Sequence, residues 1–299
     1  MKASRRPAAV CVTAMVLIAA YCPVAIHRMA ASDAPPALVY TRGAVDRDVT
    51  YCGSQTMDLY VPDGTGTRPL AVFVHGGGLV SGDKAYLGQV FLDALSSAGY
   101  VVASVNYRLA PGDRFPAQIE DVKCAIRFLR AHAADYGIDE DRFFAFGTSY
   151  GGTLVDLLAL TGPRSAFDTG PYLEQSSAVR AVVDMFGPAD LPGWISADGL
   201  RRIFGGDEAE LPLASPAHYV AAGAPPILIV QGAEDTTVPP SQSSELYQRL
   251  CDSGDRTQLV LVQHMGHMFE QVGGLPIDPG LPQIAHDMVA FFADAAARP

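Results

Sequence analysis

The chain has 299 residues, of which 49% are hydrophobic and 18% are charged, and its formal net charge is −11 at pH 7. This length and composition suit one large globular domain of helices and strands with a sizeable core. The acidic balance argues against a nucleic-acid partner, because nucleic-acid phosphates repel an anionic protein.

The first 32 residues differ in kind from the rest of the chain. Lys2, Arg5 and Arg6 precede an uncharged apolar stretch at residues 8–26, and small residues follow at 30–32. A basic start, an apolar core and a small-residue exit are typical of a secretory signal peptide. Because the apolar stretch is long, an uncleaved N-terminal membrane anchor is the alternative. We therefore expect an exported protein, secreted or periplasmic, or an anchored one, with a catalytic domain at residues 33–299.

From about residue 48 onward, short β-type runs alternate with helical patterns. The expected strands are 49–51 and 57–61, which form an opening hairpin, then 70–74, 100–105, 143–146, 179–183, 227–230 and 259–262. The expected helices are 87–97, one opened by Pro116, 153–160 and 284–297. Apolar strands alternating with helices predict an α/β fold whose mostly parallel central sheet has helices on both faces. In such sheets the functional residues lie at the carboxyl ends of the strands.

The segment 191–224 breaks this alternation. It is rich in Pro, Gly and Ala and carries three aromatic residues, among them Trp194. We interpret it as a small lid-like insertion over a substrate pocket, with Trp194 as a candidate pocket residue. The alternative is an ordinary surface excursion that contains one or two short helices.

The run His-Gly-Gly-Gly at residues 75–78 follows an expected strand. Its bare backbone N–H groups can stabilise a developing oxyanion. We predict that Gly76 or Gly77 supplies one N–H group of an oxyanion hole, and that Tyr150 supplies the other.

Ser149 lies in the pattern Gly-Thr-Ser-Tyr-Gly at residues 147–151, after an apolar run and before a helical one. This strand–turn–helix setting holds a serine on a strained tight turn with its Oγ exposed, as a nucleophile requires. The flanking glycines allow the turn, since a side chain at either position would collide with neighbouring backbone. The pattern therefore predicts Ser149 as a nucleophile.

A serine nucleophile needs a base, and the base needs an orienting carboxylate. His267 lies in the glycine-containing loop after the last expected strand and is the predicted base, whereas His264 ends that strand and is interpreted as structural. Asp235 follows the preceding strand and is the predicted acid, in preference to its neighbour Glu234.

Other arrangements of these side chains are open at this point. Asp184 and Asp190 follow an earlier strand and are fallback acids, unless they hydrogen-bond to local backbone. A His-x-x-His metal site at residues 264–267 lacks further ligands, so we expect no metal. The predicted reaction passes from a serine nucleophile through an acyl-enzyme to hydrolysis by water, and it requires no cofactor.

Three cysteines lie beyond the expected signal segment. Cys124 falls inside a helical pattern and is interpreted as a buried small hydrophobe. That leaves Cys52 and Cys251 as the candidate pair for a disulfide in an exported protein.

Taken together, these motifs resemble the α/β-hydrolase superfamily, and within it the carboxylesterase/lipase branch, from about residue 49 to the C-terminus. Residues 106–111 and 115–117, together with 75–78, are similar to hormone-sensitive-lipase-like esterases. Residues 118–139 and 232–239 look closer to bacterial feruloyl/acetylxylan esterase-like proteins. The resemblance implies the α/β-hydrolase fold and a serine carboxylesterase for small or short-acyl esters, with acetyl and feruloyl esters as candidates.

Two residues depart from the pattern of these esterases. Leu79 stands where many relatives carry an aromatic residue, which makes it a candidate determinant of the acyl pocket. A tyrosine directly after the nucleophile, here Tyr150, is unusual for these esterases, and in this respect the chain resembles prolyl-oligopeptidase-like peptidases. A serine peptidase or amidase, including a formamidase-like one, is therefore the alternative function. A peptidase would recruit a carboxylate pair such as Glu208 and Glu210, although a solvated acidic loop is the favoured interpretation. A long-chain lipase and a non-catalytic binding protein are weaker alternatives.

Overall fold

The computed structural model describes residues 38–298. The signal peptide or anchor expected at residues 1–32 lies outside them. Within the described part of the chain, no helix is both long and apolar enough to cross a membrane.

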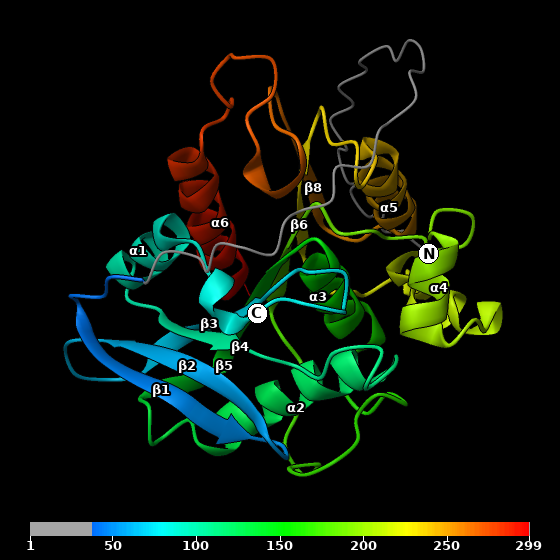
Figure 1. Ribbon diagram of the computed structural model, residues 1–299. Coiled ribbons are helices and arrows are strands. Elements are labelled where there is room, and N and C mark those ends of the chain that lie inside the picture. Colours follow the sequence, from blue (N-terminus) through cyan, green and yellow to red (C-terminus); the bar gives the residue numbers. More distant parts are fainter. Residues whose placement is uncertain (1–37, 299) are drawn as a thin grey trace, which may run out of the picture.

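One eight-stranded sheet forms the centre of the fold, in the order β1-β2-β4-β3-β5-β6-β7-β8 (Figure 1). The strands are β1 (Gly43–Tyr51), β2 (Gln55–Pro62), β3 (Arg68–Val74), β4 (Val101–Val105), β5 (Ile138–Thr148), β6 (Ala181–Met185), β7 (Ile227–Gly232) and β8 (Thr257–Val262). β2 pairs antiparallel with both β1 and β4, and every other neighbouring pair is parallel. The predicted mostly parallel sheet is therefore confirmed.

Helices cover both faces of the sheet, as expected for strands that are buried on both sides. The helices are α1 (Gln89–Ser97), α2 (Ala117–Ala131), α3 (Tyr150–Thr161), α4 (Ala197–Phe204), α5 (Pro240–Ser253) and α6 (Leu281–Ala296). α2, α3 and α5 pack into one apolar cluster and α1 and α6 into the other. Successive residues of β5 alternate between them: Phe143 and Ala145 face the first cluster, and Phe144 and Phe146 face the second.

Helix α5 was not among the elements expected from the sequence. This helix begins after Pro239 and is polar over most of its surface, so its apolar signal is confined to a few positions. Leu246 and Leu250 are spaced one helical turn apart and are completely buried. That spacing is the signal that could have identified the helix.

The segment 191–224 contains α4 and three 3-10 turns, η2 (Glu208–Glu210), η3 (Pro212–Ala214) and η4 (Pro216–Tyr219). It packs against the loop that follows β4, where the N–H of Phe115 donates to the carbonyl of Ile203 at 3.1 Å. The rings of Phe115 and Phe204 lie 5.6 Å apart. The role of this segment as a lid stays a prediction.

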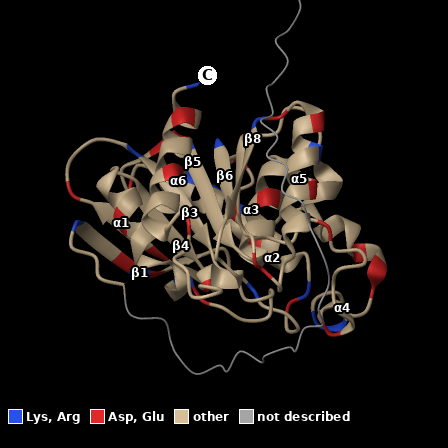
Figure 2. Cartoon of the chain, turned by 90° about the horizontal axis from the view of Figure 1, so that it is seen from above, with Lys and Arg blue, Asp and Glu red and all other residues tan. Residues whose placement is uncertain are grey.

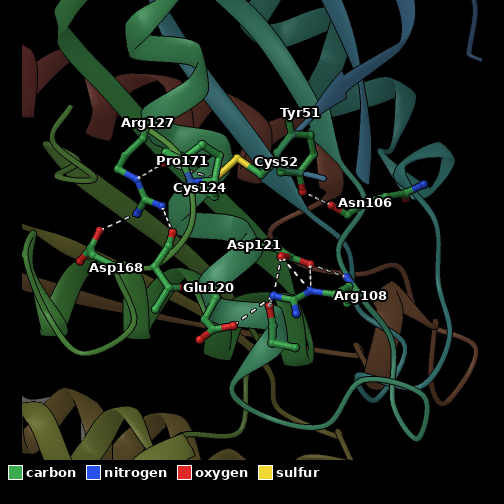
Figure 3. The surroundings of a disulfide bond; sticks show 12 residues. Tyr51, Cys52, Asn106, Arg108, Glu120, Asp121, Cys124, Arg127, Asp168 and Pro171 are labelled. Carbon is green, nitrogen blue, oxygen red and sulfur yellow. Dashed lines mark hydrogen bonds and ion pairs between the residues drawn. A yellow bond between two sulfur atoms is a disulfide. The ribbon is translucent and has the colours of Figure 1, made fainter. Parts of the chain in front are cut away.

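A disulfide joins Cys52, in the β1–β2 turn, to Cys124 on α2 (Figure 3). The interpretation of Cys124 as a free buried hydrophobe is wrong, and so is the pairing of Cys52 with Cys251. The physical reason is that α2 lies against the opening hairpin, which brings together two residues 72 positions apart. Nothing local in the sequence reports this contact.

The acidic residues are spread over α1, α4, α5 and α6 and the connecting loops, not gathered on one face (Figure 2). This distribution is typical of a solvated acidic surface.

Candidate active site

Ser149 occupies a strained turn between β5 and α3. Its φ of 54° lies in the left-handed region, which a residue with a side chain enters only at an energetic cost. The flanking glycines are required by close contacts: a Cβ on Gly147 would lie 2.2 Å from the carbonyl oxygen of Gly151, and a Cβ on Gly151 would lie 2.1 Å from that of Val74. The N–H of Ser149 donates to the carbonyl of Met185 at 2.8 Å.

The structure brings Ser149, His267 and Asp235 into one hydrogen-bonded chain. The Nε2 atom of His267 lies 2.9 Å from the Oγ of Ser149, and its Nδ1 lies 2.8 Å from the Oδ2 of Asp235. The three side chains come from the ends of β5, β7 and β8, because the carboxyl ends of parallel strands share one edge of the sheet.

Local backbone holds the carboxylate of Asp235 in place. Its Oδ1 accepts the N–H groups of Thr237 and Val238 at 2.8 and 2.9 Å. The Asp235 side chain is completely buried, so its second oxygen is left to face His267. This arrangement can fix the tautomer and orientation of the imidazole, as a catalytic base requires.

The alternative acids and base lie elsewhere. Glu234 binds the backbone N–H of Met265 at 3.1 Å, Asp184 accepts the N–H of Gly187 at 2.8 Å, and Asp190 lies 3.5 Å from Arg249. The backbone carbonyl of His264 accepts the N–H of Val272 at 2.9 Å, within the loop that follows β8.

The predicted oxyanion groups lie beside Ser149. A Cβ on Gly76 would lie 3.1 Å from the Cβ of Ser149, so Gly76 packs directly against the serine. Gly77 has a φ of +110°, and a Cβ there would lie 2.1 Å from the carbonyl oxygen of Ser81. Tyr150 is the first residue of α3, and the N–H of such a residue has no acceptor within its own helix. The arrangement can therefore present N–H groups to an oxygen bound at Ser149.

His75 and Tyr107 fix the start of the 75–78 run. Their rings stack with centroids 4.2 Å apart, and the Tyr107 hydroxyl donates to the His75 carbonyl at 2.8 Å. Burial lowers the pKa of His75 to about 4, so its imidazole is neutral near pH 7. This role of Tyr107 was not predicted from the sequence, although Tyr107 lies within the esterase-like stretch 106–111.

The candidate pocket residues lie near this site. Leu79 is buried, and its carbonyl accepts the N–H of Ala110 at 2.9 Å. Trp194 is partly buried, with its ring 6.2 Å from that of Tyr150. Their role in substrate binding stays a prediction. Glu208 is exposed on η2. Among the described residues, no group of three His, Cys, Asp or Glu side chains could hold a metal ion.

Comparisons with known proteins identify similar chains. The BD-FAE family model matches residues 57–250. Esterase LipC of Mycobacterium tuberculosis is 30% identical over 233 residues, which cover 74% of this chain and 58% of LipC. The chain spans about half the length of the curated relatives it matches, between 46% and 58% for the first four.

Solved structures show the same fold. A truncated carbohydrate esterase from gut microbiota has a TM-score of 0.74 and 27% identity, covering 86% of this chain and 98% of that one. The butyrate-bound esterase Est2 of Thermogutta terrifontis has a TM-score of 0.67 and 25% identity, covering 80% and 88%. These matches confirm the predicted resemblance to α/β-hydrolase esterases. They give no support to the peptidase or amidase alternative.

Proposed function

Because this chain belongs to the BD-FAE family, we propose that it is a serine carboxylesterase that hydrolyses small or short-acyl esters. The observation that carries the proposal is the hydrogen-bonded chain from Asp235 through His267 to Ser149, with distances of 2.8 and 2.9 Å. A nucleophile, a base and an orienting acid in this arrangement are the components of acyl transfer.

Each step of the reaction follows from this geometry. His267 takes the hydroxyl proton of Ser149 at Nε2 while the Oγ attacks the ester carbonyl carbon. The N–H groups of Gly76 or Gly77 and of Tyr150 hold the oxyanion, and one such donor is worth roughly 3–4 kcal/mol of transition-state stabilisation. His267 then gives its proton to the leaving alcohol. It next activates a water molecule, which releases the acid and restores Ser149.

The substrate class follows from the pocket residues and from the relatives. Leu79 is buried two residues after Gly77, and the Trp194 ring lies 6.2 Å from that of Tyr150, so both are placed to limit the space for the acyl chain. One similar structure is a carbohydrate esterase and another binds butyrate, which supports acetyl or other short acyl groups on a polyhydroxylated alcohol. Feruloyl esters are a second acyl class for the same site.

We further propose that the protein acts outside the cytoplasm, either secreted or periplasmic. The Cys52–Cys124 disulfide supports this location, because such bonds persist in oxidising compartments. An N-terminally anchored form is the alternative, and only that form would meet a membrane.

Hydrolysis of p-nitrophenyl acetate, butyrate and octanoate, beside an aminoacyl-anilide, tests the proposal. The wild type should prefer the shorter esters. Ser149→Ala and His267→Ala should each lower kcat by at least about 10⁴-fold. His264→Ala is the matched control in the same loop and should retain activity. Anilide cleavage without ester preference would favour a peptidase, and unchanged activity in Ser149→Ala would contradict the mechanism.

A further inference from the structure

Two aspartates that the proposed reaction does not use lie together beneath the nucleophile turn. Asp156 is on α3 and Asp184 is on β6, and both side chains are completely buried. The Asp184 side chain contacts α3 at Gly152, which precedes Asp156 by one helical turn. A Cβ on Gly152 would lie only 1.9 Å from the Oδ1 of Asp184. The two buried carboxyl groups are therefore neighbours, and each shifts the pKa of the other.

Three of the four carboxyl oxygens of this pair lack a protein donor, and a proton between the two groups would join them. The Oδ1 of Asp184 accepts the N–H of Gly187 at 2.8 Å. The Oδ2 of Asp184 and both oxygens of Asp156 have no other donor. Two ionised carboxylates have no donor to share and repel each other, whereas a protonated Asp156 can donate to the Oδ2 of Asp184. Burial raises the pKa of both groups, that of Asp156 well above its usual value and that of Asp184 to about 7.

No cation compensates for the pair among the described residues. The helix α2 packs against α3, but its buried Lys123 and Arg127 both bind Asp168. The turn η4 also packs against α3, and the ring of its His218 lies edge-on to that of Tyr219.

The charged residues of β3 and β5, Arg68 and residues 139–142, lie at the amino ends of these strands, whereas Asp184 pairs with Gly147 near the carboxyl end of β5. Among the described residues, the other carboxyl group is therefore the ionisable side chain that acts on each aspartate.

The turn after Asp184 contacts both the nucleophile and the base. The Met185 carbonyl accepts the N–H of Ser149 at 2.8 Å, and the ring of Phe186 lies edge-on to that of His267 at 5.0 Å. Phe186 has a φ of 53°, so this turn is strained and needs support. Its support comes from the Gly187–Asp184 hydrogen bond and from the Thr153 hydroxyl, which donates to the Pro188 carbonyl at 2.7 Å.

We propose that Asp156 and Asp184 are a positioning pair for the reaction at Ser149: a proton held between them ties α3 to the turn at residues 185–188. This inference rests on the proposed esterase function. While the proton is present, the pair keeps the Ser149 hydroxyl and the His267 ring within hydrogen-bonding distance of each other. When it is lost, two buried carboxylates repel and the turn moves away from α3.

Two substitutions of Asp156 separate this role from simple packing. The Asp156→Asn side chain has the same shape and carries a permanent N–H donor, so it should restore the contact without a titrating proton. Asp156→Leu fills similar space but cannot donate, so kcat should fall roughly 10- to 100-fold while KM changes little. Asp190→Asn is the matched control, because Asp190 is close in sequence but contacts Arg249.

The decisive measurements are kcat for p-nitrophenyl acetate and the unfolding temperature, each from pH 5 to 10. The native pair binds a proton more tightly than the unfolded chain does. Its contribution to stability is therefore present at acid pH and is lost as pH rises through the folded pKa values. Wild type should lose both kcat and unfolding temperature on the alkaline side, and Asp156→Asn should lose less of each. Asp184→Asn should behave like Asp156→Asn.

The outcomes distinguish this inference from the proposed function. If the wild type hydrolyses the ester but the pH profiles of wild type and Asp156→Asn coincide, the positioning pair is overturned and the esterase function stands. If Asp156→Leu folds and keeps the wild-type kcat, the pair is likewise overturned. Absence of ester hydrolysis by the wild type would overturn the proposed function itself.

Discussion

Two hydrogen bonds join Glu234 to Met265: the Glu234 carboxylate accepts the Met265 N–H at 3.1 Å, and the Glu234 N–H donates to the Met265 carbonyl at 3.1 Å. Glu234 directly precedes Asp235, and Met265 comes two residues before His267. These two hydrogen bonds therefore hold the loop of the acid against the loop of the base.

We expect Glu234→Ala to lower kcat for p-nitrophenyl acetate by about 10-fold with little change in KM, because a small displacement of His267 affects the reacting geometry more than binding. Glu234→Gln keeps an oxygen that can accept the Met265 N–H, so it should retain most of the activity. Steady-state kinetics and thermal unfolding of both variants provide the check. Equal losses in the two variants would show that the charge of Glu234, not its acceptor, matters.

The central elements of this fold and site could be predicted because their signals are local. Continuous apolar runs identified every strand of the parallel sheet, and parallel strands bring their carboxyl ends to one edge. Ser149, Asp235 and His267 each lie within five residues of the end of such a run, so chain order alone suggested that they meet. The structure then supplied the two distances that join them.

The features that could not be predicted depend on contacts between distant segments. The pairing of Cys52 with Cys124 requires knowing where α2 crosses the opening hairpin. Asp156 sits on a helix that is buried almost all round, so its sequence position does not show that it meets Asp184. Glu234 was considered only as a rival acid, because its partner is a backbone N–H 31 residues away.

The Cys52–Cys124 disulfide should stabilise the fold substantially. It closes a loop of 72 residues, for which the loss of chain entropy in the unfolded state corresponds to about 4 kcal/mol. We expect Cys52→Ala/Cys124→Ala to lower the free energy of unfolding by about 2–4 kcal/mol, measured by guanidinium denaturation under non-reducing conditions. The double variant avoids leaving one thiol free. A loss below about 1 kcal/mol would mean that the unfolded chain gains little freedom when the bond is removed.

Asp168 is the shared partner of two buried cations. Its carboxylate lies 3.2 Å from the Nζ of Lys123 and 2.8 Å from the guanidinium of Arg127, and all three side chains are buried. Asp168→Ala should cost about 3–5 kcal/mol in the free energy of unfolding, because it leaves two buried cations without an acid. Urea denaturation measures this cost.

Lys123→Met is the matched control for Asp168→Ala. Burial lowers the pKa of Lys123, so the charged form of this side chain is already disfavoured in the fold. The variant leaves Asp168 paired with Arg127 and should cost far less than Asp168→Ala. Similar losses in the two variants would mean that Lys123, and not the shared carboxylate, holds α2 to the loop after α3.

The Tyr107 hydroxyl supports the run 75–78, which carries two of the proposed oxyanion groups, by donating to the His75 carbonyl. Tyr107→Phe preserves the stack on His75 but removes the hydrogen-bond donor to the buried His75 carbonyl. Leaving this buried acceptor without a donor should lower the free energy of unfolding by about 1–3 kcal/mol. Since His75 directly precedes Gly76, a shift of its carbonyl moves the N–H groups aimed at the oxyanion. We expect kcat to fall by about 10-fold, less than the loss of a whole oxyanion donor, with KM nearly constant. Tyr86→Phe is the control, because that ring meets His75 edge-on at 6.3 Å. Wild-type kcat in Tyr107→Phe would show that the 75–78 run keeps its position without this hydrogen bond.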